Sequence, residues 1–162
     1  MTIRAEALAR RVEQGHQELI DLIDQLSEED WQRAIPGDQR TVGVVLHHIA
    51  SVLPIETSLF QTLAAGKAIQ GVTLQAVAEM NAQHAQDHAH CTKAETLALL
   101  KQNSPQALRA IRELSDAELD QAAPVSLHWN APLTTQYFIE DHPLSHSYHH
   151  LTLIRETVGI SA

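Results

Sequence analysis

Cysteine, basic residues and long apolar runs are scarce in this chain of 162 residues, and each scarcity excludes a class of protein. The single cysteine, Cys91, rules out an internal disulfide. Eleven Lys and Arg against 20 Asp and Glu give a formal charge of −9, and such a surface repels the phosphate backbone of a nucleic acid. No stretch approaches 18 uninterrupted apolar residues, so we expect no membrane-spanning segment.

Glycine and proline are also few, with six of each, while hydrophobic residues make up 44% of the chain. This composition excludes a low-complexity or disordered chain and predicts one globular domain over residues 1–162. The opening segment MTIRAEALARRVEQ has neither the apolar centre of a signal peptide nor the acid-poor composition of a transit peptide. We therefore expect a cytoplasmic protein.

Apolar residues recur at helical spacing along most of the chain, and the only strand-like alternation is the short VSLHW at 125–129. The pattern predicts four main helices, starting near residues 3, 41, 92 and 134, with a weaker helix at 73–90 and a short capped turn after Ser27. Helices of 22 to 25 residues are about 35 Å long and pack as a bundle. We expect an all-α four-helix bundle with short extra helical segments, with Trp31 and Trp129 as packing anchors at its ends.

Histidine is in excess, with 11 residues that gather in three groups. In the last predicted helix, His142, His146 and His150 follow one another at intervals of four, which places neighbours on one face about 6 Å apart. Pro143 should disturb the turn around His142, so the pair His146 and His150 is the better held. Two such imidazoles can close on one metal ion.

His48 is the candidate third ligand, because it lies within the most apolar run of the chain, where an imidazole needs a reason to be buried. His47 should point elsewhere. Three imidazoles leave a coordination position open, as in catalytic sites, and Zn, Ni and Fe all accept them. Glu56 and Asp141 are candidates to orient a ligating imidazole.

The second group, at 84–91, contains His84 and His88 at the same spacing, but in the most polar helix of the chain. We interpret it as a solvated face, with an adventitious metal site as the alternative.

The runs TVGVVLHHIA at 41–50 and HSYHH at 146–150 resemble the metal-binding helices of the DinB-like (DinB/YfiT) superfamily, and the likeness covers most of the chain. The chain differs after the second run, where Leu151-Thr152-Leu153 replace the Arg-Gly-Gln that is frequent in the family. The resemblance implies an up-down-down-up bundle, often a homodimer, that holds a divalent metal through His48, His146 and His150. Related proteins include thiol-dependent S-transferases and a mycothiol-dependent maleylpyruvate isomerase.

An up-down-down-up course requires the chain to cross the bundle between its second and third helices. Residues 66–73 alone reach about 27 Å when fully extended, which is less than the length of a helix. The weak helix at 73–90 would then complete the crossover.

Three hypotheses follow. The first is a metal-dependent enzyme that activates a low-molecular-weight thiol or water, in the manner of a thiol transferase or a hydrolase, on a small-molecule substrate. The alternative is a non-catalytic metal-binding or stress-response bundle. A third is a pH sensor, because full protonation of 11 histidines would take the net charge from −9 to about +2.

Overall fold

The computed structural model describes residues 2–160, most of which are helical. Two strands form a small hairpin near the end of the chain. In chain order the elements are α1 (Ile3–Gln25), α2 (Glu28–Gln32), α3 (Val42–Ala64), α4 (Leu74–Asp87), α5 (Lys93–Glu113), α6 (Asp116–Asp120), β1 (Ala122–Val125), a 3-10 turn (Ser126–His128), β2 (Ala131–Thr134), α7 (Thr135–Ile139), a π-helical turn (Glu140–Leu144) and α8 (Ser145–Val158).

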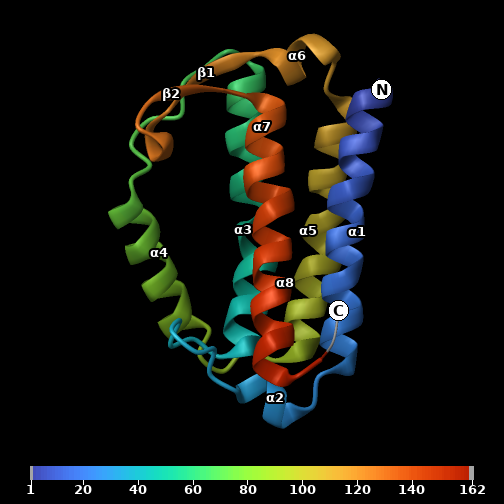
Figure 1. Ribbon diagram of the computed structural model, residues 1–162, viewed down its shortest axis with the longest axis vertical. Helices are drawn as coiled ribbons and strands as arrows, with labels where there is room; N and C mark the ends of the chain where they lie inside the picture. The colour runs from blue at the N-terminus through green and yellow to red at the C-terminus, as the bar shows by residue number, and fades with distance from the viewer. Residues whose placement is uncertain (1, 161–162) are drawn as a thin grey trace.

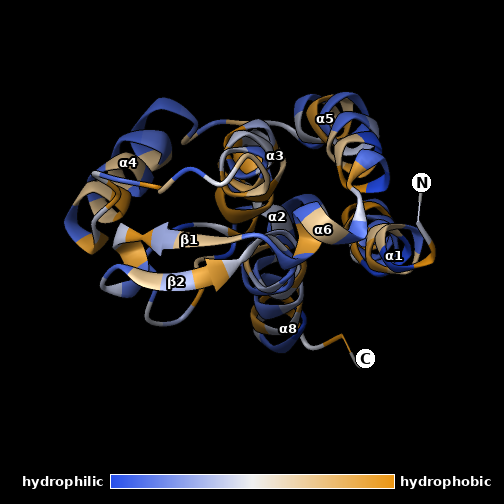
Figure 2. Cartoon of the chain, turned by 90° about the horizontal axis from the view of Figure 1, so that it is seen from above, coloured by the Kyte–Doolittle hydropathy of each residue, from blue (hydrophilic) through white to orange (hydrophobic). Residues whose placement is uncertain are grey.

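The bundle consists of α1, α3, α5 and the continuous rod formed by α7, the π-helical turn and α8 (Figure 1). Helices α3 and α5 run in one direction, and α1 and the α7–α8 rod run in the opposite direction. The predicted four-helix bundle with up-down-down-up topology is confirmed. Viewed from above, α4 stands outside these four helices (Figure 2), and it carries the chain back along the bundle between the parallel α3 and α5.

The helices begin where the sequence predicts, because the capping side chains are in place. The Thr41 side chain accepts a hydrogen bond from the N–H of Val44 at the start of α3. Thr92 and Glu95 form a reciprocal capping box at the start of α5, and Ser27 caps α2 in the same way. These local signals settle where the long helices start and therefore which residues face the bundle interior.

One of the two tryptophans anchors the core. Trp31 is 2% exposed and its indole Nε1 donates a 2.9 Å hydrogen bond to the carbonyl oxygen of Cys91. Burial raises the pKa of the Cys91 thiol, which disfavours the reactive thiolate. Trp129, in contrast, is 85% exposed in a left-handed conformation (φ 54°), so its predicted role as a packing anchor is wrong. Trp129 lies in the turn between β1 and β2, outside the bundle.

The hairpin of β1 and β2 is an addition to the all-α prediction. β1 pairs antiparallel with β2, and Ala123 lies opposite Leu133. The alternating VSLHW is not a strand, since only Val125 belongs to β1 and the next three residues form the 3-10 turn. The hairpin also holds the connector before α4, because the N–H of Ile69 donates a 2.9 Å hydrogen bond to the carbonyl oxygen of Pro124.

Helix α3 is long and apolar enough to cross a membrane by composition alone, with a mean hydropathy of 1.4 over an 18-residue window. In the bundle, 67% of that window is buried. Its apolar character is thus that of a core helix, and it surrounds His47 and His48 with hydrophobic neighbours.

His16, on α1, is a buried histidine that belongs to none of the three histidine groups of the sequence. It is 2% exposed and its Nδ1 lies 2.7 Å from Ser104 Oγ. Burial lowers the pKa of His16 to about 4. In the unfolded chain the pKa returns to about 6.5, so between pH 6.5 and 4 the unfolded state takes up a proton that the folded state does not. His16 therefore destabilises the fold as the pH falls through this window, by about 3 kcal/mol in all.

We expect His16→Gln to remove this part of the pH dependence. Urea unfolding of both proteins at pH 7 and pH 4.5 measures it, and the other histidines cancel in the comparison. Between pH 7 and pH 4.5, the free energy of unfolding should fall by about 2 to 3 kcal/mol more in the wild type than in His16→Gln. Equal slopes in the two proteins would contradict the assignment.

Candidate metal centre

The last helical rod changes its winding at Pro143, which lies in the π-helical turn Glu140–Leu144. Proline has no N–H to donate to the preceding turn, and a π turn accommodates one additional residue. His142 and His146 consequently belong to different groups of side chains, although their sequence spacing is helical. His146 and His150 both lie on α8 beyond the disturbance, as predicted.

His48, His146 and His150 converge between α3 and α8, and we call them the three-histidine cluster. Each offers a ring nitrogen that lies within 4.8 Å of the others. The Nε2 atoms of His146 and His150 are 3.0 Å apart. The ring centroid of His48 lies 5.3 Å from the ring centroid of His146 and 6.1 Å from that of His150. The structure thus brings together the three residues selected from the sequence.

Glu56, two turns after His48 on α3, orients this cluster. Its Oε1 lies 3.2 Å from His146 Nδ1, and because a carboxylate only accepts, the Nδ1–H of His146 donates this hydrogen bond. The lone pair of the neutral imidazole is then on Nε2, which faces His150. A carboxylate that fixes the tautomer of an imidazole in this way is typical of metal centres.

Two members of the cluster are deeply buried, with His48 4% and His150 6% exposed. Burial, reinforced by the neighbouring His146, lowers the pKa of each to about 3. Both imidazoles are therefore neutral at neutral pH, which is the form that binds metals.

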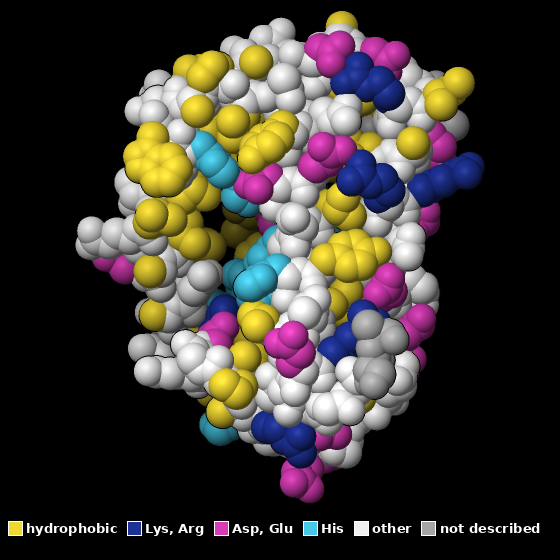
Figure 3. All heavy atoms as spheres, in the orientation of Figure 1, with side chains coloured by type: hydrophobic (Ala, Val, Ile, Leu, Met, Phe, Trp, Pro, Cys, Tyr) yellow, Lys and Arg dark blue, Asp and Glu magenta, His cyan; other side chains and the backbone are white. Residues whose placement is uncertain are grey.

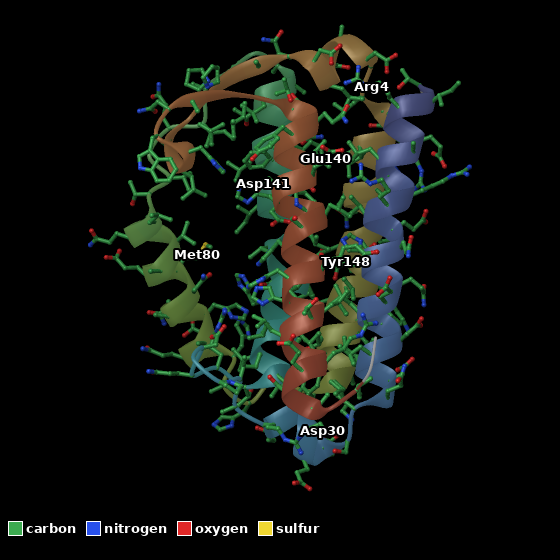
Figure 4. All side chains as sticks on the ribbon, in the orientation of Figure 1. Arg4, Asp30, Met80, Glu140, Asp141 and Tyr148 are labelled. Atoms are coloured by element: carbon green, nitrogen blue, oxygen red, sulfur yellow. The ribbon has the colours of Figure 1, made fainter. Side chains whose placement is uncertain are left out.

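The cluster borders a cavity of about 600 Å³ between α3, α4 and the α7–α8 rod. In Figure 3, histidine side chains lie at the edge of this hollow, with hydrophobic side chains across from them. Met80 on α4 and Asp141 on the rod lie on opposite sides of it (Figure 4). The lining includes Glu56 and Asp141 but, among the described residues, neither lysine nor arginine.

A groove of similar size, about 690 Å³, lies between α1 and α5 and is lined by Glu13, His16 and Arg112. None of the candidate metal-ligand groups in the described part of the chain borders it. We therefore place the candidate site at the histidine-lined cavity.

The interpretation of His84 and His88 as a solvated face needs correction. Both are half-buried, and they pack against His47 on α3. The His88 ring stacks on that of His47 with a centroid separation of 4.1 Å, and His84 Nε2 lies 2.9 Å from His47 Nδ1. The polar helix α4 turns its histidines towards the bundle because it crosses beside α3. His47 points away from the three-histidine cluster, as expected.

A third group consists of His128, Asp141 and His142. Asp141 Oδ2 lies 3.2 Å from His128 Nε2 and 3.6 Å from His142 Nε2, so Asp141 orients these histidines and not the three-histidine cluster. His128 was not selected from the sequence, since a lone histidine in a connector carries no spacing signal. Asp141 and His142 face the cavity.

Comparison with known proteins adds to this picture. Residues 12–136 match the family described as the mycothiol maleylpyruvate isomerase N-terminal domain. The solved structure of YfiT from Bacillus subtilis, described as a probable metal-dependent hydrolase with an unusual four-helix bundle topology, aligns with a TM-score of 0.76 at 17% identity, covering 99% of this chain and 91% of that one. A search of curated proteins found no significant match. The chain belongs to the mycothiol maleylpyruvate isomerase N-terminal domain family, within the DinB/YfiT-like proteins, and has the bundle fold of YfiT.

Proposed function

We propose that this protein is a metal-dependent enzyme in which His48, His146 and His150 bind one divalent transition metal, Zn, Ni or Fe. Its substrate is a small molecule that enters the adjoining cavity, and its reaction is either transfer of a low-molecular-weight thiol or hydrolysis. The observation that carries the proposal is the convergence of three imidazoles, one of them oriented by Glu56, beside a cavity that His48 and His146 line and that is large enough for a small organic molecule.

The residues present fit such an ion. The facing Nε2 atoms of His146 and His150 are 3.0 Å apart, and two lone pairs repel at that distance unless a proton or a cation lies between them. His150 Nδ1 is buried and has no hydrogen-bond partner among the described residues. An all-imidazole set suits Zn, Ni or Fe and does not suit Mg or Ca, which prefer oxygen.

The bound metal would lower the pKa of a coordinated water or thiol and polarise a carbonyl group of the substrate. The chain's own residues supply the rest of the site. Apolar side chains such as Val52, Val77 and Met80 line the cavity and exclude water. Asp141, whose Oδ2 lies 3.2 Å from His128 Nε2, places a proton acceptor on the cavity wall.

The charges at the cavity narrow the class of substrate. A bound divalent ion would balance the charges of Glu56 and Asp141, and no lysine or arginine among the described lining residues remains to bind a further anion, so an uncharged substrate fits better than a dianion. In addition, the position at which the family often has arginine is occupied here by Leu151, which is buried in the core. A thiol substrate would therefore not be held by an arginine at that position.

Activity tests the proposal directly. Tag-free protein loaded in turn with Zn, Ni and Fe would be assayed for hydrolysis of neutral esters and amides, and for conjugation of thiols, mycothiol included, to neutral electrophiles. We expect turnover in one of the two series that is lost on chelation and in His48→Ala. Stoichiometric metal with no turnover in either series would favour the non-catalytic metal-binding bundle.

Glu56→Gln tests the orienting hydrogen bond. The amide keeps an acceptor oxygen but loses the charge, so the imidazole of His146 becomes a weaker and less well-oriented ligand. We expect the affinity for the metal to fall by about 10- to 100-fold, as for other partners of ligating histidines. Isothermal titration with Zn²⁺ measures it.

The matched control is Glu140→Gln, because Glu140 lies on the rod that also carries His146 but pairs with Arg11 at 2.7 Å outside the cavity. Its Zn²⁺ affinity should equal that of the wild type. Equal affinity in the Glu56→Gln protein would show that Glu56 does not support the site.

A homodimer and a cytoplasmic location remain predictions from the sequence and its resemblance. Size-exclusion chromatography with light scattering tests the first of them.

A further inference from the structure

A second histidine cluster lies beside the proposed site and plays no part in it. His47 on α3 meets His84 and His88 at the C-terminal end of α4, and each offers a ring nitrogen within 4.8 Å of the others. His47 and His48 are adjacent in sequence, so their side chains leave α3 about 100° apart and point into different clusters. The clusters are neighbours, because the ring centroids of His48 and His84 are 5.4 Å apart.

The cluster brings three imidazoles together, and none of them forms an ion pair with a carboxylate in the described part of the chain. His47 Nδ1 and His84 Nε2 are 2.9 Å apart, and the His88 ring lies over that of His47. Among the described residues, no carboxylate oxygen lies within 4.0 Å of a ring nitrogen of these three histidines, in contrast to His146 with its Glu56, and Glu95 and Asp87 act on His47 and His84 only from a greater distance. His84 Nδ1 is buried without a hydrogen-bond partner in the described part of the chain. Buried polar atoms normally have a hydrogen-bond partner or bind an ion, and no described residue provides such a partner for this nitrogen.

Helix α4 is otherwise poorly attached to the bundle. None of its residues is buried, and its apolar Leu74 and Met80 are 69% and 40% exposed. Hydrophobic burial therefore contributes little to holding α4 in place. Yet α4 forms one wall of the cavity, through Val77 and Met80 among others. A link between α3 and α4 would determine whether that wall is closed.

We propose that His47, His84 and His88 form a second transition-metal site that fastens α4 to α3. Three imidazoles from two helices select an ion such as Zn²⁺, Ni²⁺ or Cu²⁺ over Mg²⁺ or Ca²⁺. The ion replaces the hydrophobic contacts that α4 lacks and holds the cavity wall against the bundle. This site is structural, and it does not depend on the reaction proposed for the neighbouring cluster.

Titration of metal-free, tag-free protein with Zn²⁺ by calorimetry counts the sites. We expect two equivalents in the wild type and one in His88→Ala, because the His88 ring packs against those of His47 and His84 and belongs to no other ligand group in the described chain. His150→Ala should also bind one equivalent, because the His150 ring packs against His48 and His146 of the first cluster and against His149, and it belongs to no other ligand group in the described chain. The matched control, His90→Ala, removes an exposed histidine near the same helix end and should bind two.

Hydrogen exchange of the α4 amides provides the second readout. With free Zn²⁺ at 100 times the dissociation constant, opening of α4 should slow by about 100-fold in the wild type and in His150→Ala, but not in His88→Ala. If His88→Ala still bound two equivalents of Zn²⁺, or if Zn²⁺ still slowed hydrogen exchange of its α4 amides as in the wild type, the second site would be overturned. An unchanged stoichiometry in His150→Ala would instead contradict the first site, so the two failures are distinguishable.

Discussion

His150→Ala is expected to lose the first metal and the activity that depends on it. The change leaves two imidazoles, His48 and His146, around an ion that needs at least three protein ligands to be held firmly. Removing a hydrogen-bond partner of a metal-ligating histidine already lowers the affinity for the metal by about 10- to 100-fold, so removing a ligating histidine itself should lower it by more than about 100-fold. Competition with a chromophoric chelator measures this change, and turnover should fall with it.

The matched control is His149→Ala, which removes the adjacent, exposed histidine of the same helix. The His149 ring lies 5.3 Å from that of His150 but belongs to none of the three ligand groups in the described chain. This variant should keep the metal. Loss of the metal in His149→Ala with retention in His150→Ala would mean that the ligand set is assigned to the wrong face of α8.

Gly43→Ala should produce the largest loss of stability. A Cβ at position 43 would lie 2.3 Å from Cε2 and Nε1 of Trp31, which is far inside van der Waals contact. Trp31 cannot move easily, because it is 2% exposed and hydrogen-bonded to Cys91. We expect the free energy of unfolding to fall by about 3 kcal/mol, as in severe overpacking, although alanine by itself favours a helix over glycine by about 1 kcal/mol.

Gly15→Ala on α1 is the control, because it makes the same chemical change in a helix. Its Cβ would lie 3.2 Å from Tyr148 Cε2, a contact that a small movement of the ring relieves. We expect a change of less than about 1 kcal/mol in either direction, because the gain in helix propensity offsets the contact. Urea unfolding compares the two variants, and a Gly43→Ala protein as stable as Gly15→Ala would refute the close packing of α2 on α3.

The parts of the fold that the sequence predicts are those with local causes. Thr41 and Thr92 cap their helices through side-chain contacts three residues away, so these starts are visible in the sequence. The pairing of His146 with His150 follows from helical periodicity. His48 is identified because a polar side chain in an apolar run must have a partner.

What the sequence does not predict depends on contacts between distant segments. The strands of the hairpin have four residues each, which is too short for an alternation to be recognised. His84 and His88 look like surface residues within their polar helix, and only the passage of α4 beside α3 brings them to His47. The pairing of Asp141 with His128 likewise requires the hairpin turn to fold back onto the rod.

The most direct test of the proposed metal centre is the metal content of tag-free protein in a His88→Ala background, which disables the second cluster. Elemental analysis after reconstitution should find about one equivalent of a transition metal per chain, the ratio expected for a single site. In the same background, His48→Ala should contain essentially none. Equal metal content in the two proteins, or none in either, would contradict the assignment of His48, His146 and His150 as a metal centre.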